Sequence, residues 1–269
     1  MDKQGYLMDT ISSSPDIKLQ NMTVHSGQFC VLKDITATFP GGKCSVILGV
    51  AGSGKSSLIK SAAGLLVPTE GRVMVDTLDI NNASKKQALA FRGMSGFVFQ
   101  DSALWQDTSA LQNVSMPLRI HQPGLDSKII YTLVSSLFRK VGFTDDPNLR
   151  PADLSTGEQK LISLARAIIH QPRILYMDDP TSNLDEDSID NVYGIIEEQK
   201  NENTTILIGT NNSDIAYRYA DYLGVIKGGK LLVFGPYEET LNKVEHILSG
   251  SLARLRARGS RNQGSKDEL

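Results

Sequence analysis

The feature that most constrains this chain is a glycine-rich segment set between two apolar ones. Residues 49–57 read Gly-Val-Ala-Gly-Ser-Gly-Lys-Ser-Ser, and the apolar run Ser45–Leu48 comes directly before them. The residues that follow, Leu58–Ala63, have the composition of the first turns of a helix. A strand, a glycine-rich turn and a helix in this order form the context that a phosphate-binding loop requires.

Each residue type in this loop has a physical role. Glycines let the backbone curl so that successive N–H groups point at phosphate oxygens, and the helix N-terminus adds a partial positive charge there. Lys55 is placed to reach the β- and γ-phosphates, and Ser56 to offer its hydroxyl to Mg²⁺. We therefore predict that the chain binds a nucleoside triphosphate and Mg²⁺ through Gly49, Gly52, Ser53, Gly54, Lys55, Ser56 and Ser57.

The rest of the apolar pattern predicts the fold class. β-rich stretches at 17–24 and 31–39 predict an N-terminal antiparallel β subdomain. Residues from about 101 to 169 have apolar positions at helical spacing, most regularly over Ser127–Val141, which predicts a helical insertion. Strands alternate with helices from Arg173 onward, as in a mostly parallel sheet covered on both faces. We expect an α/β fold with a P-loop NTPase core.

This pattern divides the chain into three parts. We expect a flexible leader at 1–16, a nucleotide-binding domain at 17–248 with its helical subdomain at about 101–169, and a basic tail at 249–269. Two interpretations of the tail stay open: a solvated chain end, or a helix that grips a partner subunit or an anionic membrane face.

Composition narrows the class of partner. The chain has 28 Lys and Arg against 30 Asp and Glu, a formal net charge of −2, which argues against a general nucleic-acid binder. No apolar signal core follows Met1, and no apolar run approaches the roughly 18–20 residues that a membrane span requires. Cys30 and Cys44 have no metal-ligand spacing and are expected to be reduced thiols. We therefore expect a cytoplasmic protein whose membrane role comes through a partner.

A second motif, which is acidic, supplies candidate residues for Mg²⁺ binding and hydrolysis. The apolar run Ile174–Met177 ends in Asp178 and Asp179, at the strand edge where ligands bind in such sheets. Asp178 is suited to hold the hydration shell of Mg²⁺ beside Ser56. Asp179 is expected on the γ-phosphate side, where a carboxylate can polarise the attacking water.

A third motif resembles one family. Leu154-Ser155-Thr156-Gly157-Glu158-Gln159 comes shortly before the acidic pair, and Asn183-Leu184-Asp185 comes just after it. With the phosphate loop and Gln100 in the right order, the chain from about Ile17 to Pro236 resembles the ATP-binding cassette (ABC) ATPases.

The resemblance implies a partner arrangement. ABC ATPases form head-to-tail dimers that sandwich two ATP molecules, and they serve integral membrane permease subunits from the inner face of the cell membrane. Ser155 and Gly157, at a helix start, would then hold the γ-phosphate of ATP on the other subunit. Gln100 matches the glutamine loop, which touches Mg²⁺ or water, and Asp185 matches the dimer-interface aspartate.

Three positions depart from the family pattern. Asp179 stands where the family has a catalytic glutamate, and its carboxylate is shorter in reach by roughly 1–1.5 Å. Asn211 stands where a switch histidine is expected, and it cannot carry a charge. Thr156 replaces the first glycine of the family's signature segment, which is Leu154–Gln159 in this chain. These departures predict tight ATP binding with slow turnover, in one of two forms: the degenerate half of an asymmetric dimer with an intact second ATPase, or a slow homodimer.

The residue that stacks on the adenine base of ATP is left open by the sequence. His25 or Phe29 is expected in place of the family's adenine-stacking aromatic residue.

The cargo is also left open. Residues 99–105 and 113–119 loosely resemble cassettes that power lipid transport with MCE-type proteins, whereas 157–159 is closer to lipoprotein-release and macrolide-export cassettes. Trp105 is a candidate contact for a coupling helix of a membrane subunit. The alternative function is a cassette that toggles dimerisation for signalling or regulation without transport.

Overall fold

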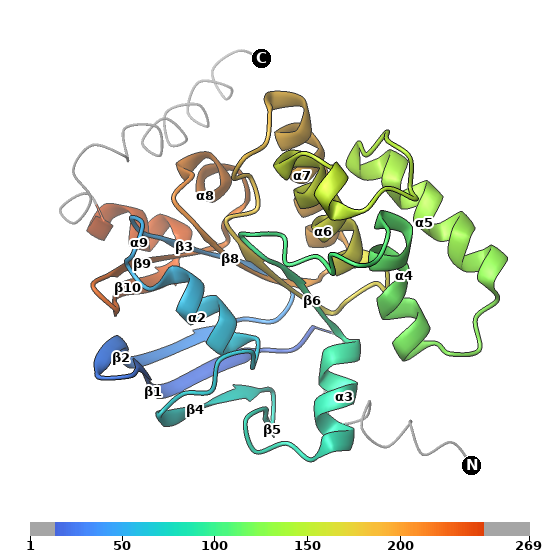
Figure 1. Cartoon of the computed structure of the whole chain (residues 1–269). Coiled ribbons are helices and arrows are strands. Elements are labelled where there is room, and N and C mark those ends of the chain that lie inside the picture. The colour runs from blue at the N-terminus through green and yellow to red at the C-terminus, as the bar shows by residue number, and fades with distance from the viewer. Residues whose placement is uncertain (1–13, 245–269) are drawn as a thin grey trace, which may run out of the picture.

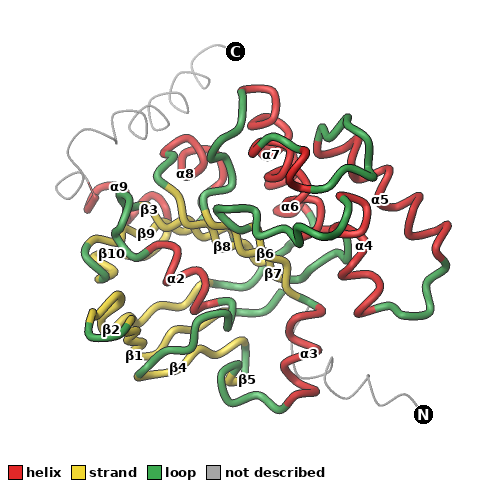
Figure 2. The backbone as a smooth tube through the Cα atoms, in the orientation of Figure 1, coloured by secondary structure: helices red, strands yellow, loops and turns green. Residues whose placement is uncertain are grey.

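The computed structural model of the protein describes residues 14–244. The whole of the expected basic tail and most of the expected leader lie outside the described residues. Figures 1 and 2 show two β-sheets, with helices gathered mainly on the side of the larger sheet that faces away from the smaller one.

The smaller sheet is the predicted antiparallel β subdomain, with strand order β2-β1-β4-β5. Its strands are β1 (Ile17–Ser26), β2 (Phe29–Phe39), β4 (Glu70–Val75) and β5 (Leu78–Asp79). All three neighbouring pairs are antiparallel. The β1–β2 hairpin reaches further than the apolar pattern indicated, because Ser26 pairs with Phe29 around Gly27, whose φ is 59°.

The larger sheet is mostly parallel, as predicted, with strand order β10-β9-β3-β8-β7-β6. Its strands are β3 (Cys44–Leu48), β6 (Ser95–Val98), β7 (Ile174–Asp178), β8 (Thr205–Thr210), β9 (Tyr222–Lys227) and β10 (Lys230–Pro236). Only the β9–β10 hairpin is antiparallel among these described strands. Every residue of β3, β7 and β8 is buried, as expected for central strands covered on both faces.

Alternation along these strands divides the interior into two cores. Ile174 and Tyr176 of β7 pack with the antiparallel sheet and α2 (Lys55–Ala62), whereas Leu175 and Met177 pack with the helices on the other face. Successive strand residues point to opposite faces, so one strand contributes to both cores. Helix α2 therefore lies between the two sheets, with the phosphate loop at its N-terminal end.

The predicted helical insertion contains α4 (Ala110–His121), α5 (Ser127–Val141) and α6 (Thr156–Ile168). Helix α5 has the predicted bounds, and α6 begins at the helix start expected at Ser155, which is its N-cap. Helix α3 (Lys85–Gly93) was not predicted; it begins with a Ser84–Gln87 capping box. The remaining elements are α7 (Glu186–Asn201), α8 (Ser213–Tyr219), α9 (Tyr237–Val244) and a short 3₁₀ turn, η1 (Pro151–Asp153).

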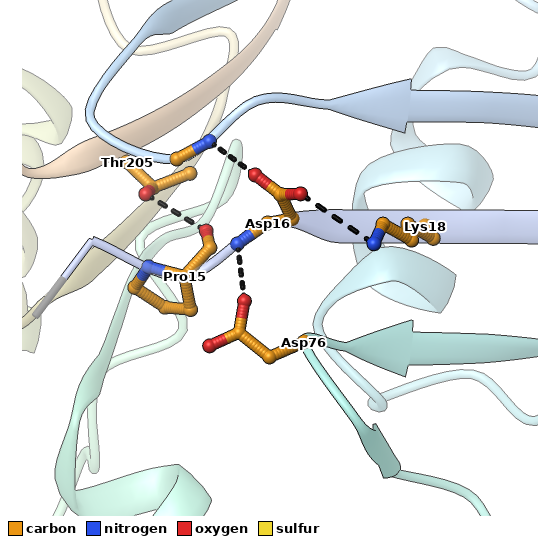
Figure 3. A network of polar contacts seen from close by, with 6 residues as sticks. Pro15, Asp16, Lys18, Asp76 and Thr205 are labelled. Carbon is orange, nitrogen blue, oxygen red and sulfur yellow. Dashed lines mark hydrogen bonds and ion pairs between the residues drawn. The ribbon is translucent and has the colours of Figure 1, made fainter. Parts of the chain in front are cut away.

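A polar network joins the two sheets where β1 begins (Figure 3). The Asp16 carboxylate accepts a 2.8 Å hydrogen bond from the Gly41 amide, and the Asp16 amide donates to Asp76. The Thr205 hydroxyl, at the start of β8, donates 3.0 Å to the Pro15 carbonyl. Pro15 and Asp16, at the end of the expected leader, thus bond to the folded body. Within residues 14–244, no helix combines the length and apolarity needed to cross a membrane.

Candidate functional site

The phosphate loop connects β3 to α2, and its glycines are required by space and backbone angle. A Cβ atom on Gly49 would lie 2.5 Å from the Ser53 hydroxyl and 2.6 Å from the Ile226 carbonyl. Gly52 and Gly54 have φ angles of 75° and 106°, in the region that favours glycine. The backbone therefore curls as the sequence predicted.

The N-terminus of α2 is built to receive an anion. Gly54 is its N-cap, and no described side chain caps the helix, which leaves its first N–H groups for a ligand. Lys55 is 6% exposed, and its Nζ donates 2.7 Å to the Gly49 carbonyl and 3.0 Å to the Val50 carbonyl. Burial lowers the pKa of Lys55, while the charges of Asp179 and Asp178 oppose this shift. The ammonium group thus lies inside the curve of the loop.

Asp178 lies beside the loop at the end of β7. The Ser56 hydroxyl donates a 2.9 Å hydrogen bond to Asp178 Oδ1. The other oxygen, Oδ2, is buried and finds no hydrogen-bond partner among residues 14–244. Burial raises the pKa of Asp178, and the Ser56 hydrogen bond acts in the opposite direction. A buried carboxylate oxygen without a partner is costly, so this oxygen is a candidate ligand position.

Asp179 has an unusual backbone and a held side chain. Its φ is 48°, a conformation that non-glycine residues rarely adopt. Its amide donates 2.8 Å to the Gly209 carbonyl, and its carboxylate accepts a 2.8 Å hydrogen bond from Thr210 Oγ1. Strained backbone of this kind is common at functional sites. The carboxylate is thereby fixed against the end of β8.

The signature segment forms the start of α6, as predicted. Ser155 is the N-cap: its hydroxyl oxygen accepts from the Glu158 amide, and the Glu158 carboxylate accepts from the Ser155 amide at 2.7 Å. Because the Ser155 hydroxyl accepts in this capping box, its own proton can still be donated to a ligand.

The signature segment also approaches the loop that contains Asp185. A Cβ atom on Gly157 would lie 3.3 Å from the Asn183 carbonyl. Asp185 caps α7 by accepting a 2.8 Å hydrogen bond from the Ser188 amide. The Ser188 hydroxyl and, to a lesser extent, the Ser188 amide lower the pKa of Asp185. The predicted residues thus form two groups: the loop residues with Asp178 and Asp179, and Ser155 with Gly157 and Asp185.

The other predicted residues lie at strand ends. Gln100 and Asn211 are exposed just beyond β6 and β8. For the base contact, Phe29 is 80% exposed at the β1–β2 hairpin, and His25 Nδ1 lies 3.0 Å from Thr69 Oγ1.

Sequence reasoning missed three polar residues near the site: Thr210, Lys160 and Arg166. Thr210 holds Asp179, while Lys160 and Arg166 of α6 bond the loop after β6. A signal for Lys160 existed, because this lysine stands directly before Leu161–Ala165, a segment that is apolar except for Ser163.

Comparison with known proteins identifies this set of elements. The family model described as ABC transporter matches residues 32–182, more than half of the chain. The chain is 34% identical over 233 residues to "Probable ribonucleotide transport ATP-binding protein mkl" of Mycobacterium tuberculosis, covering 86% of this chain and 65% of that protein. It is 32% identical over 223 residues to the methionine import ATP-binding protein MetN of Vibrio cholerae, covering 82% and 64%. The chain spans just under two thirds of the length of these relatives.

A solved structure agrees with the sequence comparison. The dimeric ATP-binding cassette MJ0796, in a post-hydrolysis state bound to ADP and Pi, matches with a TM-score of 0.77 at 25% identity. The match covers 82% of this chain and 98% of that chain. Since the family model, the relatives and the fold agree with the motifs, the chain belongs to the ABC transporter family and contains its ATPase domain.

Proposed function

We propose that this protein is the ATP-binding and ATP-hydrolysing subunit of an ABC transporter, which drives a membrane partner by ATP-dependent dimerisation. The observation that carries the proposal is the hydrogen bond of 2.9 Å between Ser56 and Asp178 beside the phosphate loop. It brings a hydroxyl and a carboxylate, the two ligand types expected for Mg²⁺ next to phosphates, to the N-terminus of α2.

The donor set supports Mg²⁺ as the cation. Residues 14–244 contain no cluster of three His, Cys, Asp or Glu side chains that would form a metal site alone. Ser56, Asp178 and the amide of Gln100 instead offer oxygen ligands that phosphates and water would complete, which is typical of Mg²⁺. Bound there, Mg²⁺ would neutralise charge on the phosphates. Lys55 would hold the β- and γ-phosphates, and Asp179 would orient the attacking water.

Dimerisation follows from the second group of residues. The Ser155 hydroxyl and the Gly157 backbone lie at the N-terminus of α6, which favours a γ-phosphate offered by another subunit. The MJ0796 cassette is itself dimeric. We propose a second ATPase subunit as partner, either a copy of this chain or a different cassette.

The permease partner has a candidate docking groove. A hollow of about 370 Å³ between the helical insertion and β6 is lined by Phe97, Phe99, Trp105, Met116 and Ile120, among others. Trp105 is 48% exposed and Ile120 is 51% exposed. The lining also includes Arg92, Arg166 and two histidines, and its larger part is apolar, which suits an apolar side chain from a helix of a membrane subunit. The protein would then lie on the inner face of the cell membrane.

Slow turnover is part of the proposal. Thr210 fixes the short Asp179 side chain, and the exposed Asn211 stands where the family has a histidine that can carry a charge. For the cargo we retain a lipid, on the sequence resemblance of residues 99–105. The relatives are named for ribonucleotide and methionine transport, and no residue of the ATP site selects a cargo.

The test is ATP binding and hydrolysis by the purified chain with and without Mg²⁺, beside Lys55→Ala. We expect Mg²⁺-dependent binding and slow hydrolysis, both lost in Lys55→Ala. Isolation of the tagged chain from membranes should bring integral membrane proteins with it. ATP-driven dimerisation without membrane partners or cargo movement would favour the regulatory cassette, and indifference to ATP would exclude both functions.

A further inference from the structure

Lys160 is a buried cation outside the proposed catalytic group. It lies on α6, five residues after the signature Ser155, and is only 1% exposed. Its Nζ donates 2.7 Å to the Phe99 carbonyl and 2.6 Å to the Gln100 carbonyl. Lysine is almost never fully buried unless it has partners, so this position requires an explanation.

The ammonium group of Lys160 is held by carbonyl oxygens. None of the ion pairs among the described residues includes Lys160. Burial lowers its pKa to about 8, and the charges of Asp178, Asp179 and Asp101 oppose that shift. The contacts of the ammonium group are thus to the loop after β6, and its charge interacts favourably with the carboxylates at the end of β7.

A second cation from the same helix holds the next part of that loop. Arg166 donates 2.9 Å from Nη2 to the Ser102 carbonyl and 2.9 Å from Nη1 to the Ala103 carbonyl. Ser102 and Ala103 have φ angles of 63° and 45°, which these residue types rarely adopt. The loop from Phe99 to Ala103 thus takes its shape from bonds to α6.

We propose that Lys160 is a positioning residue for ATP hydrolysis, which ties the backbone of Gln100 to the helix that begins at Ser155. Gln100 serves the nucleotide of its own subunit, and Ser155 serves the nucleotide of the facing subunit. Because Lys160 links these two residues rigidly, a change at the nucleotide beside Gln100 moves Ser155 at the nucleotide of the facing subunit. The two nucleotide sites are thereby coupled. The inference rests on the proposed ATPase function.

The test is a double-mutant cycle with Lys160→Met and Gln100→Ala, which isolates the coupling between the two residues. We expect Lys160→Met to lower kcat about tenfold or more while the ATP Kd stays within about threefold. In the Gln100→Ala background, the same change should lower kcat no further. The matched control is Lys140→Met, which removes an exposed lysine of α5, 44% exposed, and should leave kcat unchanged.

The chain offers its own probe of the loop. Trp105 is its single tryptophan, two residues after Ala103. We expect ATP to change Trp105 fluorescence in the wild type and in Lys140→Met, and the change to be lost in Lys160→Met. Additive losses of kcat in the cycle, or an unaltered fluorescence response, would overturn the proposal.

Two further measurements separate a folding defect from a loss of activity: the cooperativity of unfolding of each variant, and ATP hydrolysis by the wild type. If Lys160→Met does not unfold cooperatively, Lys160→Gln, which keeps a neutral donor, replaces it in the cycle. Failure of both variants to fold would make Lys160 a folding residue and overturn the proposal. If the wild type binds ATP without hydrolysing it, the proposed ATPase function fails, and the fluorescence response alone decides the role of Lys160.

Discussion

The Thr210 hydroxyl donates a 2.8 Å hydrogen bond to the carboxylate of Asp179. Thr210 ends β8 and Asp179 follows β7, and these neighbouring strands pair in parallel register. The bond therefore fixes the acidic side chain at the edge of the sheet where phosphates are expected. A short carboxylate held in this way is the structural basis for expecting slow hydrolysis.

Lengthening that carboxylate should speed the reaction. We predict that Asp179→Glu raises the single-turnover rate of ATP hydrolysis, by about ten- to a hundredfold, because misplacement near 1 Å can cost about a hundredfold. Asp179→Asn serves as the control and should keep ATP binding while losing the remaining hydrolysis. A fast wild type with no gain in the glutamate variant would show that Asp179 is not the limiting feature.

Ser155 should both stabilise α6 as its N-cap and contribute to ATP-dependent dimerisation. Ser155→Ala removes the N-cap and should lower the free energy of unfolding by about 1 kcal/mol. Ser84→Ala is the matched control, since Ser84 forms the same capping box on α3. Both variants should lose similar stability in urea unfolding, but only Ser155→Ala should lose ATP-dependent dimerisation in light scattering. Equal dimerisation by both variants would remove Ser155 from the nucleotide interface.

Local sequence signals explain which elements could be predicted. Helix α5 has strong apolar periodicity, an Asp126 cap and a Gly142 in the left-handed region at its end, and its predicted bounds match the structure. Helix α3 lies close to the surface and buries only Phe91, so its apolar pattern is weak and the Ser84–Gln87 pair was the usable signal. Helix α3 could therefore be predicted better from its capping residues than from apolar periodicity.

The residues of the candidate site also divide into those that local sequence signals predict and those that they do not. The phosphate loop and the signature are contiguous motifs, so residues such as Lys55 and Ser155 could be named from their neighbours in sequence. The Thr210–Asp179 contact spans 31 positions and the Lys160–Phe99 contact spans 61. Such contacts depend on strand order and helix packing, which a single sequence does not specify residue by residue.

Close packing of the signature helix against β6 gives a stability prediction. A Cβ atom on Gly96 would lie 2.1 Å from the Ala167 carbonyl, so Gly96→Ala should lower the free energy of unfolding by about 1–3 kcal/mol. Gly194→Ala is the control: it lies inside α7, where a Cβ atom would meet no described atom within 4 Å. It should raise stability by about 0.5–1 kcal/mol because alanine favours helix. Urea unfolding of both variants measures the difference; similar effects would show that β6 and α6 separate easily.

Acid sensitivity should come partly from His170, which lines the candidate docking groove. Burial lowers its pKa from 6.5 to about 4, while its hydrogen bond to the Ser95 carbonyl acts in the opposite direction and nearby His121 adds to the lowering. Between these two pH values the unfolded chain binds a proton at this residue that the folded protein does not. Stability must therefore fall as the pH drops through this window.

His170→Gln tests this, because glutamine can still donate to the Ser95 carbonyl but does not titrate. Between pH 7.5 and pH 5.0, the wild type should lose up to about 2 kcal/mol more unfolding free energy than the variant. His25→Gln, at an exposed position on the β1–β2 hairpin, is the control and should lose as much as the wild type. If His170→Gln loses stability in acid to the same extent as His25→Gln, the folded protein accepts a proton on His170 at no cost, and the acid sensitivity must come from other groups.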